Sequence, residues 1–134
     1  EVGGMDLVML TNDNGASALF IAAQEGHVEV VRALMGVGNG ELAMLRSNGG
    51  YGALHIAAQE GNVEVARALL EVGKRDLAML TNDDGRSALD LAVREGHLEV
   101  ARAVLDFGGI ELVKLTNNDN VHAFYSQEQW RILS

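Results

Sequence analysis

The chain contains no cysteine and no proline, and aromatic residues make up only 4% of its 134 residues. The absence of cysteine excludes disulfide bonds, thiolate metal sites and a cysteine nucleophile. No apolar run approaches the roughly 18 residues that a bilayer-spanning helix needs, so we expect no membrane segment within these residues. The first residue is Glu1 and not methionine, so we expect the chain to be an excerpt of a longer protein.

Basic residues are also scarce, because 10 Lys and Arg stand against 19 Asp and Glu and give a net charge of −9. Proteins that bind nucleic acid neutralise its phosphates with a basic stripe, and the isolated pair Lys74 and Arg75 does not make one. We therefore expect no nucleic-acid partner. The acidic field of the chain instead favours a partner that carries a basic patch.

Glycine, in contrast, is abundant, and many of the 16 glycines recur at a fixed interval of 35 residues. The periodic series are Gly15, Gly50 and Gly85, then Gly26, Gly61 and Gly96, and then Gly38, Gly73 and Gly108. Self-similarity at a period between 20 and 50 residues is typical of a solenoid or repeat array. The whole chain is therefore interpreted as one array. Its predicted parts are the end of a preceding repeat at 1–10, full repeats at 11–45, 46–80 and 81–115, and a partial repeat with a cap or junction at 116–134.

Each repeat has the pattern of two helices joined by a turn. In the first repeat, residues 18–25 predict a short helix rich in small residues, closed by Gly26 in the left-handed conformation that suits glycine. Ser17 provides an N-cap hydroxyl for this helix. Apolar residues at helical spacing then predict a second helix over about 28–37, ended by Gly38.

The segment Gly15–Met35 (GASALFIAAQEGHVEVVRALM) resembles an ankyrin repeat. The copies at Gly50–Leu70 and Gly85–Leu105 match that family equally well, and the resemblance covers about residues 1–125. The resemblance implies an all-α solenoid of helix-turn-helix-loop units. It also implies a non-catalytic module that binds other proteins.

Three features depart from the family pattern. The Thr-Pro pair that starts the first helix is replaced by Ser17-Ala18 and its counterparts, and the histidine of that motif survives only as His55. The period is 35 residues, where the family has about 33, and the two extra residues fall in the loop over 39–52. Residues Glu41–Leu45 predict a short helical turn in this loop, which we expect to replace part of the family's β-hairpin finger.

The histidines do not predict a metal site or a catalytic pair. His27 and His97 occupy the same position two repeats apart, and helices stacked at 8–10 Å would separate them by roughly 20 Å. One ion cannot bind both, so we expect each to have a structural, capping role. The resemblance implies that His55 hydrogen-bonds the neighbouring turn, and a role for it in the groove remains the alternative.

The polar clusters Asn12–Gly15 and Asn82–Gly85 are interpreted as ordinary Asx turns. They fail as calcium loops because apolar residues stand where the first and the twelfth ligand would be. Acidic residues recur once per repeat, and such repetition singles out no buried catalytic pair. We therefore expect no catalytic residue, no metal ligand and no cofactor.

Positions that change between repeats are the candidates for partner binding, since the constant ones serve stacking. They fall at the loop tips and on the groove side of the first helices, which the resemblance places on the concave face. The candidates are Asp13, Asn14, Ala16, Gln24, Asn48, Gly49, Tyr51, Gln59, Asp83, Asp84, Arg86 and Arg94. Tyr51 and Arg86 are of the residue types enriched at interface hot spots. The alternative is that loop tips vary because they are solvated and unconstrained.

The sequence thus predicts a monomeric array that binds a protein partner. One alternative is that the array is the targeting or scaffold portion of a larger multidomain protein whose catalytic domain lies outside these residues. Another is an engineered or structural array, although the second and third repeats agree at only 15 of 35 positions, fewer than a consensus design would show. The aromatic and apolar residues of 116–134, among them Phe124 and Trp130, are expected to cap the last repeat. The alternatives are a junction that leads into another domain and a segment that binds a partner.

Overall fold

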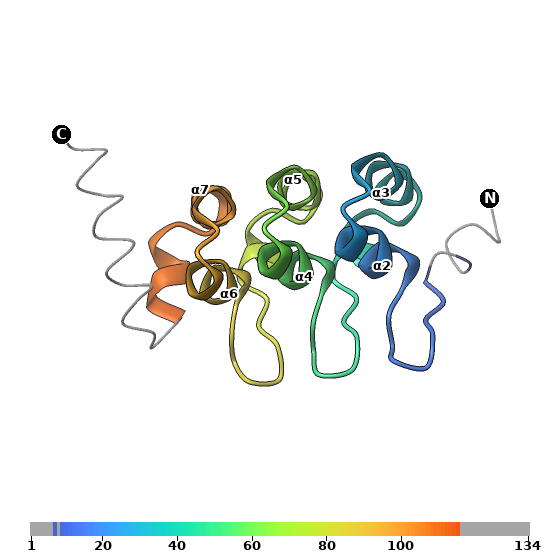
Figure 1. The fold of residues 1–134 in the computed structure, drawn as a ribbon, viewed down its shortest axis with the longest axis horizontal. Coiled ribbons are helices and arrows are strands. Elements are labelled where there is room, and N and C mark those ends of the chain that lie inside the picture. Colours follow the sequence, from blue (N-terminus) through green and yellow to red (C-terminus); the bar gives the residue numbers. More distant parts are fainter. Residues whose placement is uncertain (1–6, 8, 116–134) are drawn as a thin grey trace.

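The computed structural model describes residue 7 and residues 9–115, except for the side chain of Asn39. This part of the chain contains six helices and no strand. They are α2 (Ala18–Glu25), α3 (Val28–Ala43), α4 (Ala53–Glu60), α5 (Val63–Ala78), α6 (Ala88–Glu95) and α7 (Leu98–Leu115). The short helices stack in one row, the long helices stack in a second row beside them, and three loops project from the short row (Figure 1). The predicted all-α solenoid is confirmed.

The short helices begin and end where local sequence signals predict. The Ser17 hydroxyl accepts a hydrogen bond from the backbone N–H of Phe20, and Gly26 closes α2 with φ 76°. Gly61 and Gly96 close α4 and α6 in the same left-handed conformation. This geometry favours glycine, which has no Cβ to clash with the preceding carbonyl.

The core consists of leucine, valine and alanine side chains trapped between neighbouring repeats. Leu19, Leu54 and Leu89 occupy the same position in the three short helices and are at most 1% exposed. The paired alanines beside them, such as Ala57 and Ala58, are fully buried. Small side chains let the helices of adjacent repeats approach closely, so each repeat completes the core of the next.

The long helices include a further helical turn beyond the predicted end, and in α5 and α7 this turn follows a kink at Lys74 and Gly109. We expected Gly38 to end α3, and this was wrong, because α3 continues to Ala43. The extra residues form an additional helical turn, and its Leu42 packs so closely on Gly38 that a Cβ there would collide with it. Gly73 and Gly108 meet Leu77 and Leu112 in the same way. In α5 and α7 the backbone leaves the helical conformation directly after these glycines, at Lys74 (φ 52°) and Gly109 (φ 62°). Gly73 and Gly108 therefore leave room for the following leucine and also precede a kink between two helical segments.

The predicted helical turn forms, and a β-hairpin finger follows it at the ends of α3 and α5. The fingers are residues 11–17, 46–52 and 81–87, and each is closed by an antiparallel bridge between its ends. Neighbouring fingers are also joined, because the N–H of Asn48 donates to the carbonyl of Asn14 at 2.9 Å. The N–H of Asp83 donates to the carbonyl of Gly49 at the same distance. The three fingers therefore form a connected row.

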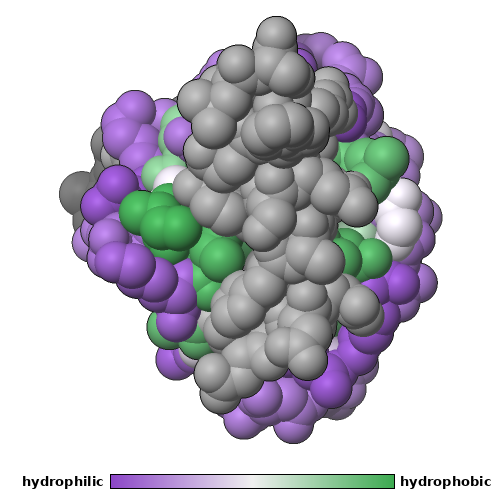
Figure 2. Space-filling view, turned by 90° about the vertical axis from the view of Figure 1, so that its left-hand side faces the viewer, coloured by the Kyte–Doolittle hydropathy of each residue, from purple (hydrophilic) through white to green (hydrophobic). Residues whose placement is uncertain are grey.

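At the end of the array that carries α7, apolar side chains reach the surface (Figure 2). Ile110 and Leu115 are 44% and 45% exposed. An array that ends in apolar surface is stabilised by a capping segment. Our prediction that 116–134 provides this cap concerns residues outside the described part of the chain, and it remains a prediction.

Asn62 gives a local test of helix capping. Its side-chain oxygen accepts a hydrogen bond of 3.0 Å from the backbone N–H of Val65 at the start of α5. Replacing Asn62 by alanine removes this acceptor, and we expect the free energy of unfolding to fall by about 1 kcal/mol. Chemical denaturation measures the change. Asn62→Ser is the matched control because a serine side chain can also cap a helix. Equal losses of unfolding free energy in the two variants would contradict the capping role of Asn62.

Candidate partner-binding surface

The variable positions lie along the finger row and at the ends of the short helices. Most of the twelve candidates are exposed to solvent, whereas Tyr51 is half-buried and Ala16 is buried, with only 8% of its surface exposed. Gln24, Gln59 and Arg94 stand near the C-terminal ends of α2, α4 and α6. Ala16 therefore offers little surface for direct contact.

Five of these candidates converge on one hollow between the first and second fingers. The hollow has a volume of about 430 Å³. The candidates that line it are Asn14, Ala16, Gln24, Asn48 and Tyr51. The candidates of the third repeat, including Arg86, do not line it.

The sequence reasoning missed the apolar part of this hollow. Phe20 and Ile21 line it from α2, and Ile56 lines it from α4. Ile21 is 43% exposed, although Ile56 and Leu91 at the same repeat position are 6% and 0% exposed. In the sequence Ile21 is indistinguishable from a core residue. Phe20 could have been identified as a candidate from the sequence, because its position is variable and is occupied by His55 and Asp90 in the other repeats.

Tyr51 is held in place by its own finger and by the helix that follows it. Its ring makes an edge-on contact with the ring of His55, with the two centroids 5.9 Å apart. The N–H of Ser47 donates to the carbonyl of Tyr51 at 2.7 Å, which fixes the backbone of the finger. A half-buried aromatic side chain on a fixed backbone loses little conformational freedom when a partner binds. Tyr51 therefore has the properties of an interface anchor.

His55 has the structural role that we expected. It is 1% exposed, its Nδ1 accepts from the N–H of Gly52 at 3.0 Å, and its Nε2 lies 3.2 Å from the carbonyl of Arg86. It thus caps α4, where Gly52 has no side chain to do so, and links two fingers. Burial in the core lowers the pKa of His55 from its usual value of 6.5.

His97 makes a contact between repeats, whereas His27 makes no capping contact. The Nε2 of His97 lies 3.1 Å from the carbonyl of Gln59 in the preceding repeat. His27 makes no side-chain hydrogen bond to the start of α3, so the expected capping role was wrong for this residue. At the corresponding position in the second repeat, the side chain of Asn62 does cap α5.

The polar clusters at the fingers are turns, as the sequence predicted. The side-chain oxygen of Asn12 accepts from the N–H groups of Asn14 and Ala16 at 2.9 and 3.0 Å. Asn82 makes the corresponding bonds to Asp84 and Arg86. Among the described residues, no three His, Cys, Asp or Glu side chains are grouped so as to hold a metal ion.

Exposed carboxylates lie at the first and third finger tips. Asp13, Asp83 and Asp84 are exposed, and none of them forms a salt bridge within the described residues. Arg94 differs, because its Nε lies 3.8 Å from a carboxylate oxygen of Glu95. The finger tips therefore offer unpaired carboxylates to a partner, whereas the charge of Arg94 is partly balanced within the array.

A comparison with known protein families decides what this arrangement represents. The family model for ankyrin repeats, with three copies, matches residues 4–76 and 39–119. The chain belongs to the ankyrin repeat family. No curated protein sequence matches the chain. Ankyrin repeats are generally protein–protein interaction modules and are typically non-catalytic.

The ankyrin array has no helix within its described residues that is both long and apolar enough to cross a membrane. Its exposed faces carry the acidic and amide side chains described above.

Proposed function

We propose that this ankyrin array binds a protein partner through its finger tips and the groove beside its short helices. The observation that carries the proposal is the convergence of variable residues on one hollow. Positions such as Asn14, Asn48 and Tyr51 were selected only because they change between repeats, and they line the same 430 Å³ space. Phe20 and Ile21 add exposed apolar surface at that point.

The hollow fits an apolar side chain of the partner surrounded by hydrogen-bonding groups. Phe20, Ile21 and Tyr51 supply apolar contact, and the amides of Gln24 and Asn48 are exposed beside them. Ligand-binding hollows typically combine an apolar lining with a few polar groups that fix orientation. Because hydrogen bonds join the fingers, binding here would need little ordering of the array.

Alanine substitution tests this assignment. We expect Tyr51→Ala to weaken capture of the partner by about tenfold, since truncating an aromatic anchor at an interface typically costs 1–2 kcal/mol or more. Arg86→Ala should weaken capture less, because Arg86 lies outside the hollow. Quantitative pull-down with the chain and each variant measures both effects.

The matched control for this experiment is Val30→Ala. Val30 is 48% exposed on α3 and does not line the hollow, so its truncation should leave capture unchanged. If Tyr51→Ala and Arg86→Ala both recover the same partner as well as the unmodified chain, the assignment to this surface is wrong.

We further infer that the partner presents a basic patch and that the array acts as a monomer. The exposed carboxylates of Asp13, Asp83 and Asp84 and the net charge of −9 support this inference. Opposite charges raise the association rate, and salt screens them. Raising the ionic strength from about 50 to 500 mM should therefore slow association by tenfold or more, and surface plasmon resonance measures the rate. An association rate that does not change with salt would contradict the inference that the partner presents a basic patch.

A further inference from the structure

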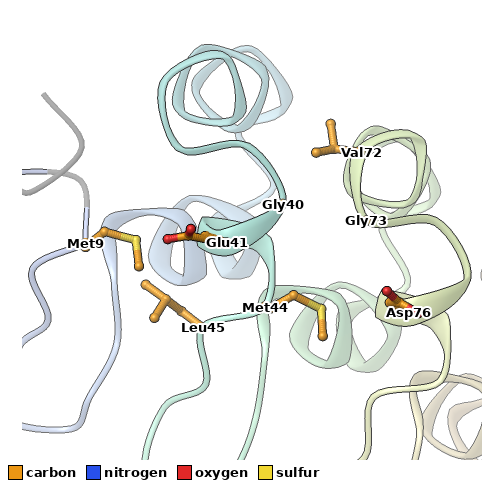
Figure 3. Close-up of a pocket in the computed structure, with 8 residues that line it drawn as sticks. All are labelled: Met9, Gly40, Glu41, Met44, Leu45, Val72, Gly73 and Asp76. Carbon is orange, nitrogen blue, oxygen red and sulfur yellow. The ribbon is translucent and has the colours of Figure 1, made fainter. Parts of the chain in front are cut away.

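A second hollow lies at the ends of the long helices, away from the finger tips. It has a volume of about 500 Å³, and it lies between the last turns of α3 and α5 (Figure 3). Its lining residues include Met9, Met44, Leu45 and Val72. It shares no lining residue with the first hollow and contains none of the candidate binding residues. It is therefore a separate feature of the surface.

This hollow is open because position 40 carries no side chain. The corresponding positions in the next two repeats are Arg75 and Ile110, whereas a Cβ built on Gly40 meets no atom within 4 Å. Gly40 lies inside α3 and does not have the positive φ that would require glycine. Neither backbone geometry nor packing thus explains glycine at this position. The missing side chain leaves the hollow open at Gly40.

The walls of the hollow are apolar and adaptable. Met44 and Leu45 are half-buried and Val72 is 38% exposed. Met9 faces the same space from the preceding repeat (Figure 3). Methionine side chains adjust to irregular partners because they have several rotatable bonds and a polarisable sulfur.

Two carboxylates stand at the rim. Glu41 comes from the added turn of α3, and Asp76 occupies the corresponding place in α5 (Figure 3). Both are exposed, neither forms a salt bridge within the described residues, and no Lys or Arg lines the hollow. This charge disfavours an anionic ligand and favours an apolar group that carries positive charge beside it.

We propose that this hollow is a second binding site, which takes a short peptide segment with an apolar side chain flanked by lysine or arginine. The apolar side chain lies against Met44, Leu45 and Val72, and the cation lies beside Glu41 or Asp76. A hollow of this size holds one or two side chains, which fits a turn of an amphipathic helix. The proposal does not depend on the function assigned to the finger tips, because the two surfaces share no residue.

The test uses a fluorescein-labelled amphipathic peptide of leucine and lysine, and a twin in which every lysine is replaced by glutamate. Fluorescence polarisation with the full chain measures binding of each. We expect the lysine peptide to bind and the glutamate twin to bind at least tenfold more weakly, since opposite and like charge differ by more than 1.4 kcal/mol at such a rim. Equal binding of the two peptides, or no binding of the lysine peptide, would overturn the proposal.

Gly40→Leu fills the hollow and should weaken binding of the lysine peptide by about tenfold or more. The matched control is Gly36→Leu, because Gly36 also lies in α3 with open space at its Cβ but does not line the hollow. Leucine favours helix more than glycine does, so both variants should fold, which circular dichroism checks. Equal affinity of the two variants for the peptide would show that the hollow is not the site.

Two further variants separate this site from the finger tips. Replacing Glu41 by Gln together with Asp76 by Asn should weaken binding severalfold and reduce its dependence on salt. Tyr51→Ala should leave binding of the lysine peptide unchanged. If Tyr51→Ala abolishes binding while Gly40→Leu does not, the peptide occupies the finger-tip hollow and the second site is refuted.

Discussion

Replacing Leu54 by alanine is expected to lower the free energy of unfolding by about 2–5 kcal/mol. Leu54 is 1% exposed at the middle of the short-helix row, where α4 contacts both α2 and α6. Its truncation removes apolar burial and leaves a cavity that the tightly packed alanines around it cannot fill. Because repeats stabilise one another through their interfaces, a loss in the central repeat affects both neighbours.

Thermal and chemical denaturation measure this effect, and we expect the melting temperature to fall by about 10 °C or more. Leu98→Ala is the matched control, since Leu98 is 50% exposed on α7. Its truncation should change stability by less than about 0.5 kcal/mol. Similar losses for the two variants would contradict the position of Leu54 in the core.

The second large effect is a dependence of stability on pH through His55. Burial lowers the pKa of His55 in the folded chain below 6.5, and the nearby charge of Arg46 acts in the same direction. As the pH falls below about 6.5, the unfolded chain therefore takes up a proton before the folded chain does. The stability associated with neutral His55 is fully present above pH 6.5 and is lost as the pH falls through the folded-state pKa.

The hydrogen bond from the N–H of Gly52 acts in the same direction as burial, whereas the backbone hydrogen bonds to Arg86 and Leu80 raise the pKa of His55 and are outweighed by burial. The Nδ1 atom accepts from the N–H of Gly52, so it has no proton of its own, and the proton on Nε2 is directed to the carbonyl of Arg86. Protonating Nδ1 would place two donors against each other and break the cap of α4. We therefore expect the free energy of unfolding to be nearly constant from pH 7 to 8 and to fall between pH 6.5 and 5.

Urea denaturation at a series of pH values, with the chain and with His55→Asn, tests this expectation. The variant should be less stable at pH 7 by about 1–3 kcal/mol, because the carbonyl of Arg86 loses its partner, and it should lose stability less steeply below pH 6.5. Asn62→Ala is the control, since it removes a helix cap and leaves His55 in place. If the free energy of unfolding falls equally steeply below pH 6.5 in His55→Asn and in the unmodified chain, His55 is not the source of the pH dependence.

Helix boundaries were predictable where they depend on local chemistry and not where they depend on packing. Ser17 and Gly26 mark the ends of α2 because an N-cap hydroxyl and a left-handed glycine act on their own segment. Gly38 was interpreted by the same rule as a helix end, yet α3 continues past it. Leu42 of the added turn packs on Gly38. In α5 and α7 the backbone is kinked one residue after the corresponding glycine, at Lys74 and Gly109, so the local rule located a break but not the further helical turn beyond it.

The candidate binding surface was also predictable only in part, because its residues could be identified from the sequence but their grouping in space could not. Comparing repeats identified Asn14, Asn48 and Tyr51 as variable without any structure. It did not show that they meet around one hollow, because the fingers are brought together by hydrogen bonds between residues about 34 positions apart, such as Asn48 to Asn14. Ile21 was missed because exposure, and not residue type, distinguishes it from the buried Ile56.

The sequence by itself determined the periodic features of this protein: the all-α class, the interval of 35 residues, the family and the ends of the short helices. These follow from interactions within a few residues, repeated along the chain, and a linear pattern records them fully. The tertiary structure alone decided which variable residues converge and which apolar residues remain exposed. It also decided that an absent side chain at Gly40 opens a second hollow. These features arise between repeats, where the surroundings of a residue depend on neighbours that are distant in sequence.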